Sequence, residues 1–243
     1  MSVTLVVFGF IAFALGGLVK GTLGVGLPLV VVPLLSLVMP GYQAIGWVAA
    51  PVLASNALQF WENRAHAVQV RRFTPLIVTL VGSTLLTVQL TLSLSDEAIG
   101  RMIAGAVLTG VVLTAWKPSL RVSPRSEKAW GVGVGLLSGL LGGVSSLTGP
   151  LIISYLMALR LPRDTFVGCI SVIYLCAAIP LYASMLWHDR FGADELIPSL
   201  LALIPVWGGL RLGRKLRNHL GEQGFYNVLL VFLAALAVAL LFK

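Results

Sequence analysis

The chain has 243 residues, of which 58% are hydrophobic and only 11% are charged. Soluble domains carry about 25% charged residues, so the composition excludes an ordinary soluble domain and predicts an all-α polytopic membrane protein. The net charge of +8 does not indicate nucleic-acid binding. The basic residues lie in short loops between apolar runs, which is the pattern that orients membrane proteins.

Ten helical pieces are expected, because apolar runs of up to about 20 residues recur from end to end. The first half of the chain, residues 1–120, and the second half, residues 128–243, hold five pieces each. In each half a hairpin of two pieces (3–39 and 129–160) precedes three transmembrane helices. The pieces cover residues 3–20, 27–39, 42–61, 73–94 and 97–116, then 129–144, 149–160, 165–187, 195–210 and 224–242.

Two glycine-rich segments interrupt the apolar runs at matching places in the two halves. They are GGLVKGTLGVGLPLVVVPLL at 16–35 and SGLLGGVSSLTGPLIISYLM at 138–157. With a shift of 122 positions, Gly21 matches Gly143. Pro28 likewise matches Pro150. Interruptions at corresponding places in two halves point to the substrate site of a secondary transporter, so we expect each hairpin to be broken or re-entrant.

The basic residues predict how the chain is oriented. We assign four groups of them to the cytoplasm: Arg64, Arg71 and Arg72; Lys117, Arg121, Arg125 and Lys128; Arg160 and Arg163; and Arg211, Arg214, Lys215 and Arg217. Pro40 and Pro162 match in the repeat. One predicted helix separates the turn at Pro40 from the first basic group, so this turn is expected outside the cytoplasm. The turn at Pro162 lies beside the third basic group and is therefore expected inside it. The two halves are therefore expected to be inverted repeats, with both termini outside the cytoplasm.

The breaks are predicted to form an anion site. Backbone without helical partners survives at membrane depth only inside protein or beside a wet cavity, so the two breaks are expected to face each other. A proline follows each break, and proline is favoured at the first position of a helix. Both return helices would then point their positive N-termini at the middle of the membrane. The candidate ligands there are Thr22, Gly24, Gly26, Ser145, Ser146 and Thr148.

Lys20 is the one charged residue deep in an apolar segment. A lysine at a helix centre costs about 2.5–3.5 kcal/mol, and an anionic substrate is its simplest partner. Two alternatives stay open, since the side chain could reach an interface or bind the last carbonyls of its own helix. Asn56 is expected to line the pathway, and Asn56 and Gln59 could instead join helices. For Tyr174 and Tyr182 we favour packing or an aromatic belt.

The sequence contains no enzyme signature. There is no HExxH, no GxSxG, no phosphate-binding loop and no pair of carboxylates within one segment. We therefore expect no catalytic residue, no metal site and no cofactor. A membrane enzyme acting on a lipid phosphate would need carboxylates or histidines near the breaks, and it stays an alternative together with a passive anion channel.

The chain resembles the sulfite exporter TauE/SafE family, a group of bacterial anion permeases, over nearly its whole length. The likeness rests on the two glycine-rich segments, each followed by proline and an aliphatic run, on NRAHAVQVRR at 63–72 and on WGGLRLGRKLRNHL at 207–220. The positions that match the family pattern are Gly17, Gly21, Gly24, Gly26, Pro28, Gly139, Gly143 and Pro150. Two departures, Gly26-Leu27-Pro28 and the hydroxyl-rich 145–148, fall at the expected site and leave the exact anion open.

The resemblance implies two inverted halves in the bacterial inner membrane. It also implies movement of small sulfur-containing or carboxylated anions, such as sulfite or an organosulfonate like sulfoacetate. We predict a secondary transporter, in the export direction, whose halves rock around a bound anion. Its expected partners are the small anion and the lipid bilayer, and a homo-oligomer stays open.

Overall fold

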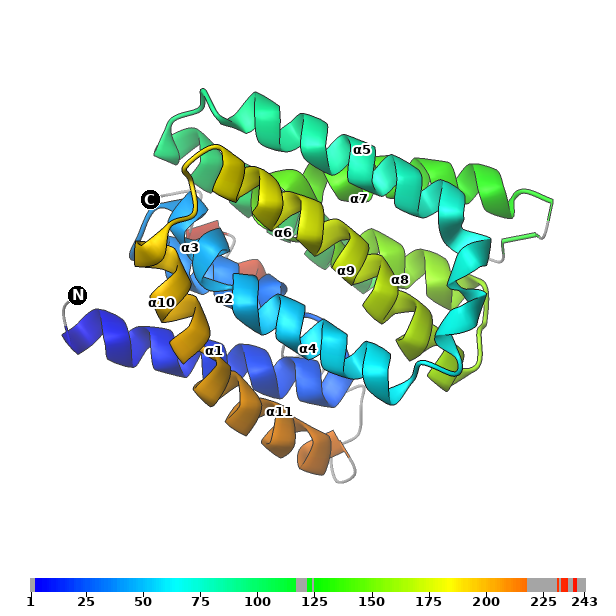
Figure 1. Ribbon diagram of the computed structural model, residues 1–243, viewed down its shortest axis with the longest axis horizontal. Helices are drawn as coiled ribbons and strands as arrows, with labels where there is room; N and C mark the ends of the chain where they lie inside the picture. Colours follow the sequence, from blue (N-terminus) through cyan, green and yellow to red (C-terminus); the bar gives the residue numbers. More distant parts are fainter. Residues whose placement is uncertain are drawn as a thin grey trace.

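The computed structural model describes residues 3–116, 122–123, 125–217, 231, 233–235 and 238–239. All regular elements over these residues are helices, as the composition predicts (Figure 1). They are α1 (Val3–Leu23), α2 (Leu27–Ser36), α3 (Gly41–Trp47), α4 (Ala49–Glu62), the 3-10 helix η1 (Ala67–Phe73), α5 (Thr74–Thr91), α6 (Asp96–Trp116), α7 (Glu127–Ser145), α8 (Gly149–Ala158), α9 (Arg163–Trp187), α10 (Ala193–Leu201) and α11 (Leu203–Arg217). The expected last helix, 224–242, falls mostly outside the described residues.

Among the described residues, four helical stretches are long and apolar enough to cross a membrane. They are Thr4–Leu23, Ala67–Thr91, Asp164–Trp187 and Ala193–Leu216. By contrast, α2 and α8 have only 10 residues each. Such helices rise about 15 Å, half of a hydrocarbon core of about 30 Å, so neither crosses the membrane alone.

Two helices that the sequence predicts as continuous are divided. The piece expected over 42–61 is split at Val48, and the piece expected over 195–210 is split at Ala202. A proline ring clashes with the carbonyl four residues earlier. Pro51 and Pro205 therefore end α3 and α10 four residues before them, at Trp47 and Leu201. The sequence contained this signal, and the continuous prediction was wrong at both points.

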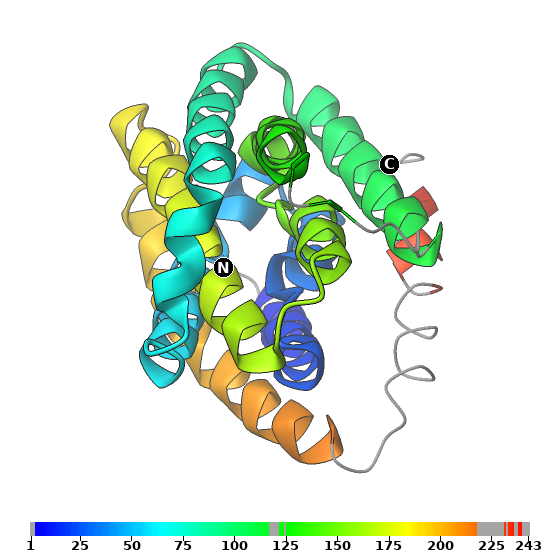
Figure 2. The ribbon, with the colours of Figure 1, turned by 90° about the vertical axis from the view of Figure 1, so that its right-hand side faces the viewer.

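Two closely packed helix pairs form opposite sides of the bundle, α1 with α11 and α5 with α7 (Figures 1 and 2). A Cβ added at Gly17 or Gly21 would overlap the carbonyl oxygens of Val206 and Leu210, respectively. Only glycine lets the two backbones approach so closely. We call this contact the α1–α11 seam.

The α5–α7 seam is built in the same way. A Cβ added at Gly135 or Gly139 of α7 would overlap the carbonyl oxygens of Leu76 and Leu80 of α5, respectively. The repeat aligns Gly17 with Gly139. The glycine that packs α1 onto a helix of the second half therefore matches one that packs α7 onto a helix of the first half.

Contacts between distant segments bring described basic residues, among them Arg72, Lys128 and Arg214, to one end of the bundle, on the right in Figure 1. There the Arg214 guanidinium pairs with Glu62 at 3.1 Å, joining the ends of α11 and α4. Arg72 pairs with Glu127, joining η1 to the start of α7. The loops that follow α5 and α9 meet at the other end of the bundle.

Candidate functional site

The two glycine-rich segments are helix breaks at corresponding positions. α1 ends at Leu23 and α2 begins at Leu27, while α7 ends at Ser145 and α8 begins at Gly149. These bounds coincide under the 122-position shift. Each break opens with a left-handed residue, Gly24 (φ 83°) in the first and Ser146 (φ 60°) in the second. The first break contains a further left-handed residue, Gly26 (φ 101°), a conformation that glycine adopts without a Cβ penalty.

The two return helices begin against the same point of α6. A Cβ added at Gly110 would lie 2.9 Å from Cγ of Pro150 in α8 and 3.7 Å from Cδ1 of Leu29 in α2. Each break also packs against residues of the other half. Val25 packs in a core cluster made mainly of second-half residues, and Leu147 packs in one made mainly of first-half residues. The N-terminal ends of α2 and α8 therefore lie together inside the bundle.

Lys20 is buried beside the first break, with 3% of its surface exposed. Its Nζ donates a hydrogen bond to Oδ1 of Asn56, which is equally buried, at 2.6 Å. The ion pairs between described residues join Arg72 to Glu127, Arg101 to Glu97 and Arg214 to Glu62.

The Lys20 amine therefore has an amide partner and no carboxylate partner in the described part of the chain. This burial argues against the alternative that the side chain reaches an interface. An ammonium group has three N–H donors, and Asn56 accepts from only one of them. The remaining donors and the uncompensated charge suit a ligand made of acceptors.

Gln59 holds the backbone of the first break. Its Nε2 donates to the carbonyl oxygen of Gly24 at 2.8 Å, and the Gly24 amide donates to the Lys20 carbonyl at 2.7 Å. Because a carbonyl only accepts, the nitrogen of the Gln59 amide must face Gly24, which leaves Oε1 buried without a hydrogen-bond partner in the described part of the chain. Asn56 and Gln59 are three residues apart and so share a face of α4. That spacing was visible in the sequence, whereas their partners were not.

Thr22 lies elsewhere. Its hydroxyl is 2.9 Å from the carbonyl oxygen of Leu18 and 3.3 Å from that of Gly213. Both oxygens belong to the α1–α11 seam. The hydroxyl therefore contributes to helix packing, and we leave Thr22 out of the ligand set proposed below.

The hydroxyl groups of the second break bind mostly to protein. The Ser145 hydroxyl donates to the Leu141 carbonyl at 2.6 Å and accepts from the Leu147 amide at 3.3 Å. The Ser146 hydroxyl lies 3.2 Å from the Tyr182 hydroxyl of α9. Thr148 is the residue that precedes the first turn of α8. Ser146 and Thr148 are thus at the N-terminal end of the return helix, and Ser145 stabilises the turn.

Tyr174 brings a further hydroxyl to the start of α8. A Cβ added at Gly149 would lie 2.9 Å from this oxygen. The oxygen is buried and has no hydrogen-bond partner among the described residues. Tyr174 and Tyr182 are eight residues apart, a spacing that places them on one stripe of a helix. We favoured packing or an aromatic belt for both residues, but the structure brings both hydroxyls to the second break.

The described residues contain no group of three or more His, Cys, Asp or Glu side chains that could hold a metal ion. The side chains around the breaks are a lysine, amides and hydroxyls, which are mainly hydrogen-bond donors toward an anion.

The model of the sulfite exporter TauE/SafE family matches residues 9–240. The chain belongs to this family. The match covers both breaks and the helices that pack around them, and it confirms the resemblance drawn from the motifs. Among curated proteins and among solved structures nothing matches the chain. Family membership and the four apolar helical stretches together make this a membrane protein of a transporter family.

Proposed function

We propose that this protein is a secondary transporter that exports a small sulfur-containing anion, such as sulfite or an organosulfonate, through a site between the two breaks. The observation that carries this proposal is the buried Lys20 amine, bonded to Asn56 beside a glycine break and without a carboxylate partner among the described residues. A bound anion supplies the missing counter-charge.

The proposed ligand set consists of donors, because sulfite and sulfonate groups present only acceptor oxygens when fully ionised. Lys20 supplies the charge, and Asn56 positions its Nζ. The left-handed backbone at Gly24 and Gly26 turns the chain from α1 into α2, and the N-termini of α2 and α8 add their dipoles. Ser146 and Thr148 supply hydroxyls from the second break. Ser145 is a positioning residue in this scheme.

We further propose that the halves are inverted repeats that rock around this site. Three observations support the relationship. The helix bounds at the breaks coincide under one shift, and Pro40 and Pro162 cap the next helices with nearly equal angles, φ −56°, ψ 141° and φ −53°, ψ 144°. In the two glycine seams, α1 of the first half packs on a helix of the second half, and the matching α7 packs on a helix of the first half. The opposite orientation of the two halves is inferred from the basic groups, which the positive-inside rule assigns to the cytoplasm.

In this topology the bundle end that carries the basic groups faces the cytoplasm of a bacterial inner membrane, and both termini lie outside the cytoplasm. A negative interior favours anion exit by about 2.3 kcal/mol per charge per 100 mV. Export can therefore proceed without an intramembrane carboxylate that relays protons.

Counterflow in proteoliposomes tests the proposal. The purified protein is reconstituted, the vesicles are loaded with unlabelled sulfite, sulfoacetate, thiosulfate, taurine or chloride, and entry of labelled sulfite is followed. A carrier gives saturable entry that internal sulfite accelerates, and sulfoacetate or thiosulfate accelerates it more than chloride. Entry that neither saturates nor responds to internal anion would indicate a channel, and no entry above empty vesicles would refute sulfite as substrate.

A further inference from the structure

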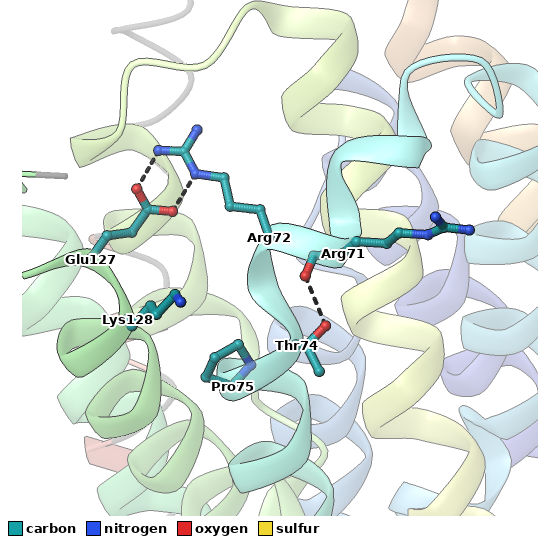
Figure 3. A pocket seen from close by; sticks show the side chains of 6 residues that line it. All are labelled: Arg71, Arg72, Thr74, Pro75, Glu127 and Lys128. Atoms are coloured by element: carbon teal, nitrogen blue, oxygen red, sulfur yellow. Dashed lines mark hydrogen bonds and ion pairs between the residues drawn. The ribbon is translucent and has the colours of Figure 1, made fainter. Parts of the chain in front are cut away.

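A basic cavity lies at one end of the α5–α7 seam, away from both breaks. It has a volume of about 530 Å³ and is lined by Arg71, Arg72, Thr74, Pro75, Glu127 and Lys128 (Figure 3). Arg72 faces Glu127 across the gap between η1 and α7, and Lys128 extends from α7 beside Pro75 (Figure 3). The cavity therefore opens between two helices at the basic end of the bundle.

The one acidic group in the lining is already neutralised. Glu127 is buried, and both of its carboxylate oxygens accept hydrogen bonds from the Arg72 guanidinium. The Tyr155 hydroxyl donates to the backbone carbonyl of Glu127 at 3.1 Å and fixes the start of α7. Arg71 and Lys128 are exposed, and neither forms an ion pair with a described carboxylate. The residues of the lining thus carry two positive charges that no described carboxylate pairs, with Lys128 on the α7 side and Arg71 extending away from it on the η1 side (Figure 3). This excess of positive charge favours an anionic ligand.

The surface next to the cavity is apolar. Val132 and Leu136 follow Lys128 at intervals of four residues along α7, and Val78 follows the lining residues of α5 by one turn. All three are exposed, Val78 by 63% of its surface. Because residues four apart share a helix face, the charged rim continues into an apolar strip on both helices. Trp130, two residues after Lys128 on α7, is half exposed, as aromatic residues are at a membrane interface.

We propose that this cavity binds the headgroup of one anionic phospholipid, with the phosphate held by the basic lining and the acyl chains along the α5–α7 seam. A soluble anion would contact only the charged residues of the cavity, whereas a phospholipid would also cover the apolar strip. Basic cavities between transmembrane helices are suited to anionic headgroups. The inference rests on residues outside both breaks and does not depend on which anion the protein transports.

Native mass spectrometry of the full chain in detergent tests the lipid site. Phosphatidylglycerol and phosphatidylcholine with identical acyl chains are titrated against the wild type and against the double variant Arg71→Gln, Lys128→Gln. The wild type should bind one phosphatidylglycerol more tightly than phosphatidylcholine. Each basic side chain near a membrane surface contributes about a fivefold gain in affinity for anionic lipid. The double variant should therefore lose about 25-fold for phosphatidylglycerol and little for phosphatidylcholine.

The matched control is the double variant Arg64→Gln, Arg211→Gln, which removes the same charge from exposed positions outside the cavity. It should keep wild-type affinity for phosphatidylglycerol. An equal loss in the control would overturn the proposal, because attraction would then be a property of the whole basic end. Displacement of phosphatidylglycerol by millimolar inorganic phosphate or sulfite would overturn it too, in favour of a soluble-anion site. If the Arg71→Gln, Lys128→Gln protein is not folded, Lys128→Gln alone should show about a fivefold loss.

Discussion

The two breaks share their helix bounds and a left-handed first residue, but they differ in backbone at the third residue (Gly26, φ 101°; Thr148, φ −77°) and in their side chains. Under the 122-position shift, α2 (Leu27–Ser36) coincides with α8 (Gly149–Ala158). The residue matching Lys20 is Gly142, and the residue matching Gly26 is Thr148. The first break therefore has a lysine and then a glycine where the second has a glycine and then a threonine.

These two differences belong together. A Cβ added at Gly142 would overlap the Thr148 methyl group, so the second break has room for the threonine because position 142 has no side chain. In the first break the larger side chain comes earlier, at Lys20, and Gly26 has none. The comparison teaches that the two halves share the position of the break, while the choice of residue decides its chemistry. In our proposal the first break supplies charge and the second supplies hydroxyls.

The largest effect on stability is expected at the first break, where a buried amine depends on one amide. Asn56→Leu removes the acceptor of the 2.6 Å bond from Lys20, and it should lower the free energy of unfolding by about 3 kcal/mol. Ser146→Ala, at the second break, removes a bond between neutral hydroxyls and should cost about 1 kcal/mol. Unfolding of both variants in mixed micelles measures the difference, and equal losses would contradict the distinction.

A smaller effect is expected where the second break is crowded. Gly142→Ala places a methyl group against Thr148, and overpacking of this kind costs about 1–3 kcal/mol, reduced by about 1 kcal/mol because alanine favours the helix. Thr148→Ser removes the obstructing methyl group. The double variant should therefore be at least as stable as the wild type, which a double-mutant cycle on the unfolding free energy would detect. Simple additivity of the two single changes would show that the residues do not interfere.

The smallest effect is expected from the left-handed residues. Gly24→Ala should cost about 1 kcal/mol, all of it from the backbone, because a Cβ at this position meets nothing within 4 Å. Ser146→Gly should leave stability about unchanged, because relief of the left-handed backbone at φ 60° offsets the loss of the bond to the Tyr182 hydroxyl. Thermal midpoints of the two purified variants would check the contrast, and a stable Gly24→Ala variant would remove the need for glycine.

The sequence predicted the features that glycine and proline control. The positions of both breaks and the short return helices followed from glycine spacing and from prolines at helix starts, whereas the helical class followed from composition. The divisions of two long helices at Val48 and Ala202 were missed, although Pro51 and Pro205 marked them. The convergence of α2 and α8 near Gly110 was expected from the cost of unpaired backbone in lipid.

The partners of the polar side chains were mostly beyond the sequence. Lys20 and Asn56 are 36 residues apart, and no local pattern pairs them. Thr22 looked like a ligand because it lies close to the first break in the chain. Its hydroxyl faces Gly213 instead, 191 residues away, because the glycines of the α1–α11 seam bring that carbonyl close. Contacts of this kind depend on how helices pack, and helix periodicity does not specify that.

The central claim is that Lys20 binds the transported anion, and sulfite counterflow by Lys20→Met tests it most directly. Methionine keeps an unbranched, buried side chain and removes the charge. Thr22→Ser is the matched control, since Thr22 lies on the same helix outside the proposed ligand set and serine keeps its hydroxyl. We predict that Lys20→Met, recovered folded and reconstituted, shows no sulfite exchange above empty vesicles while Thr22→Ser exchanges sulfite. Wild-type exchange by folded Lys20→Met would contradict the account.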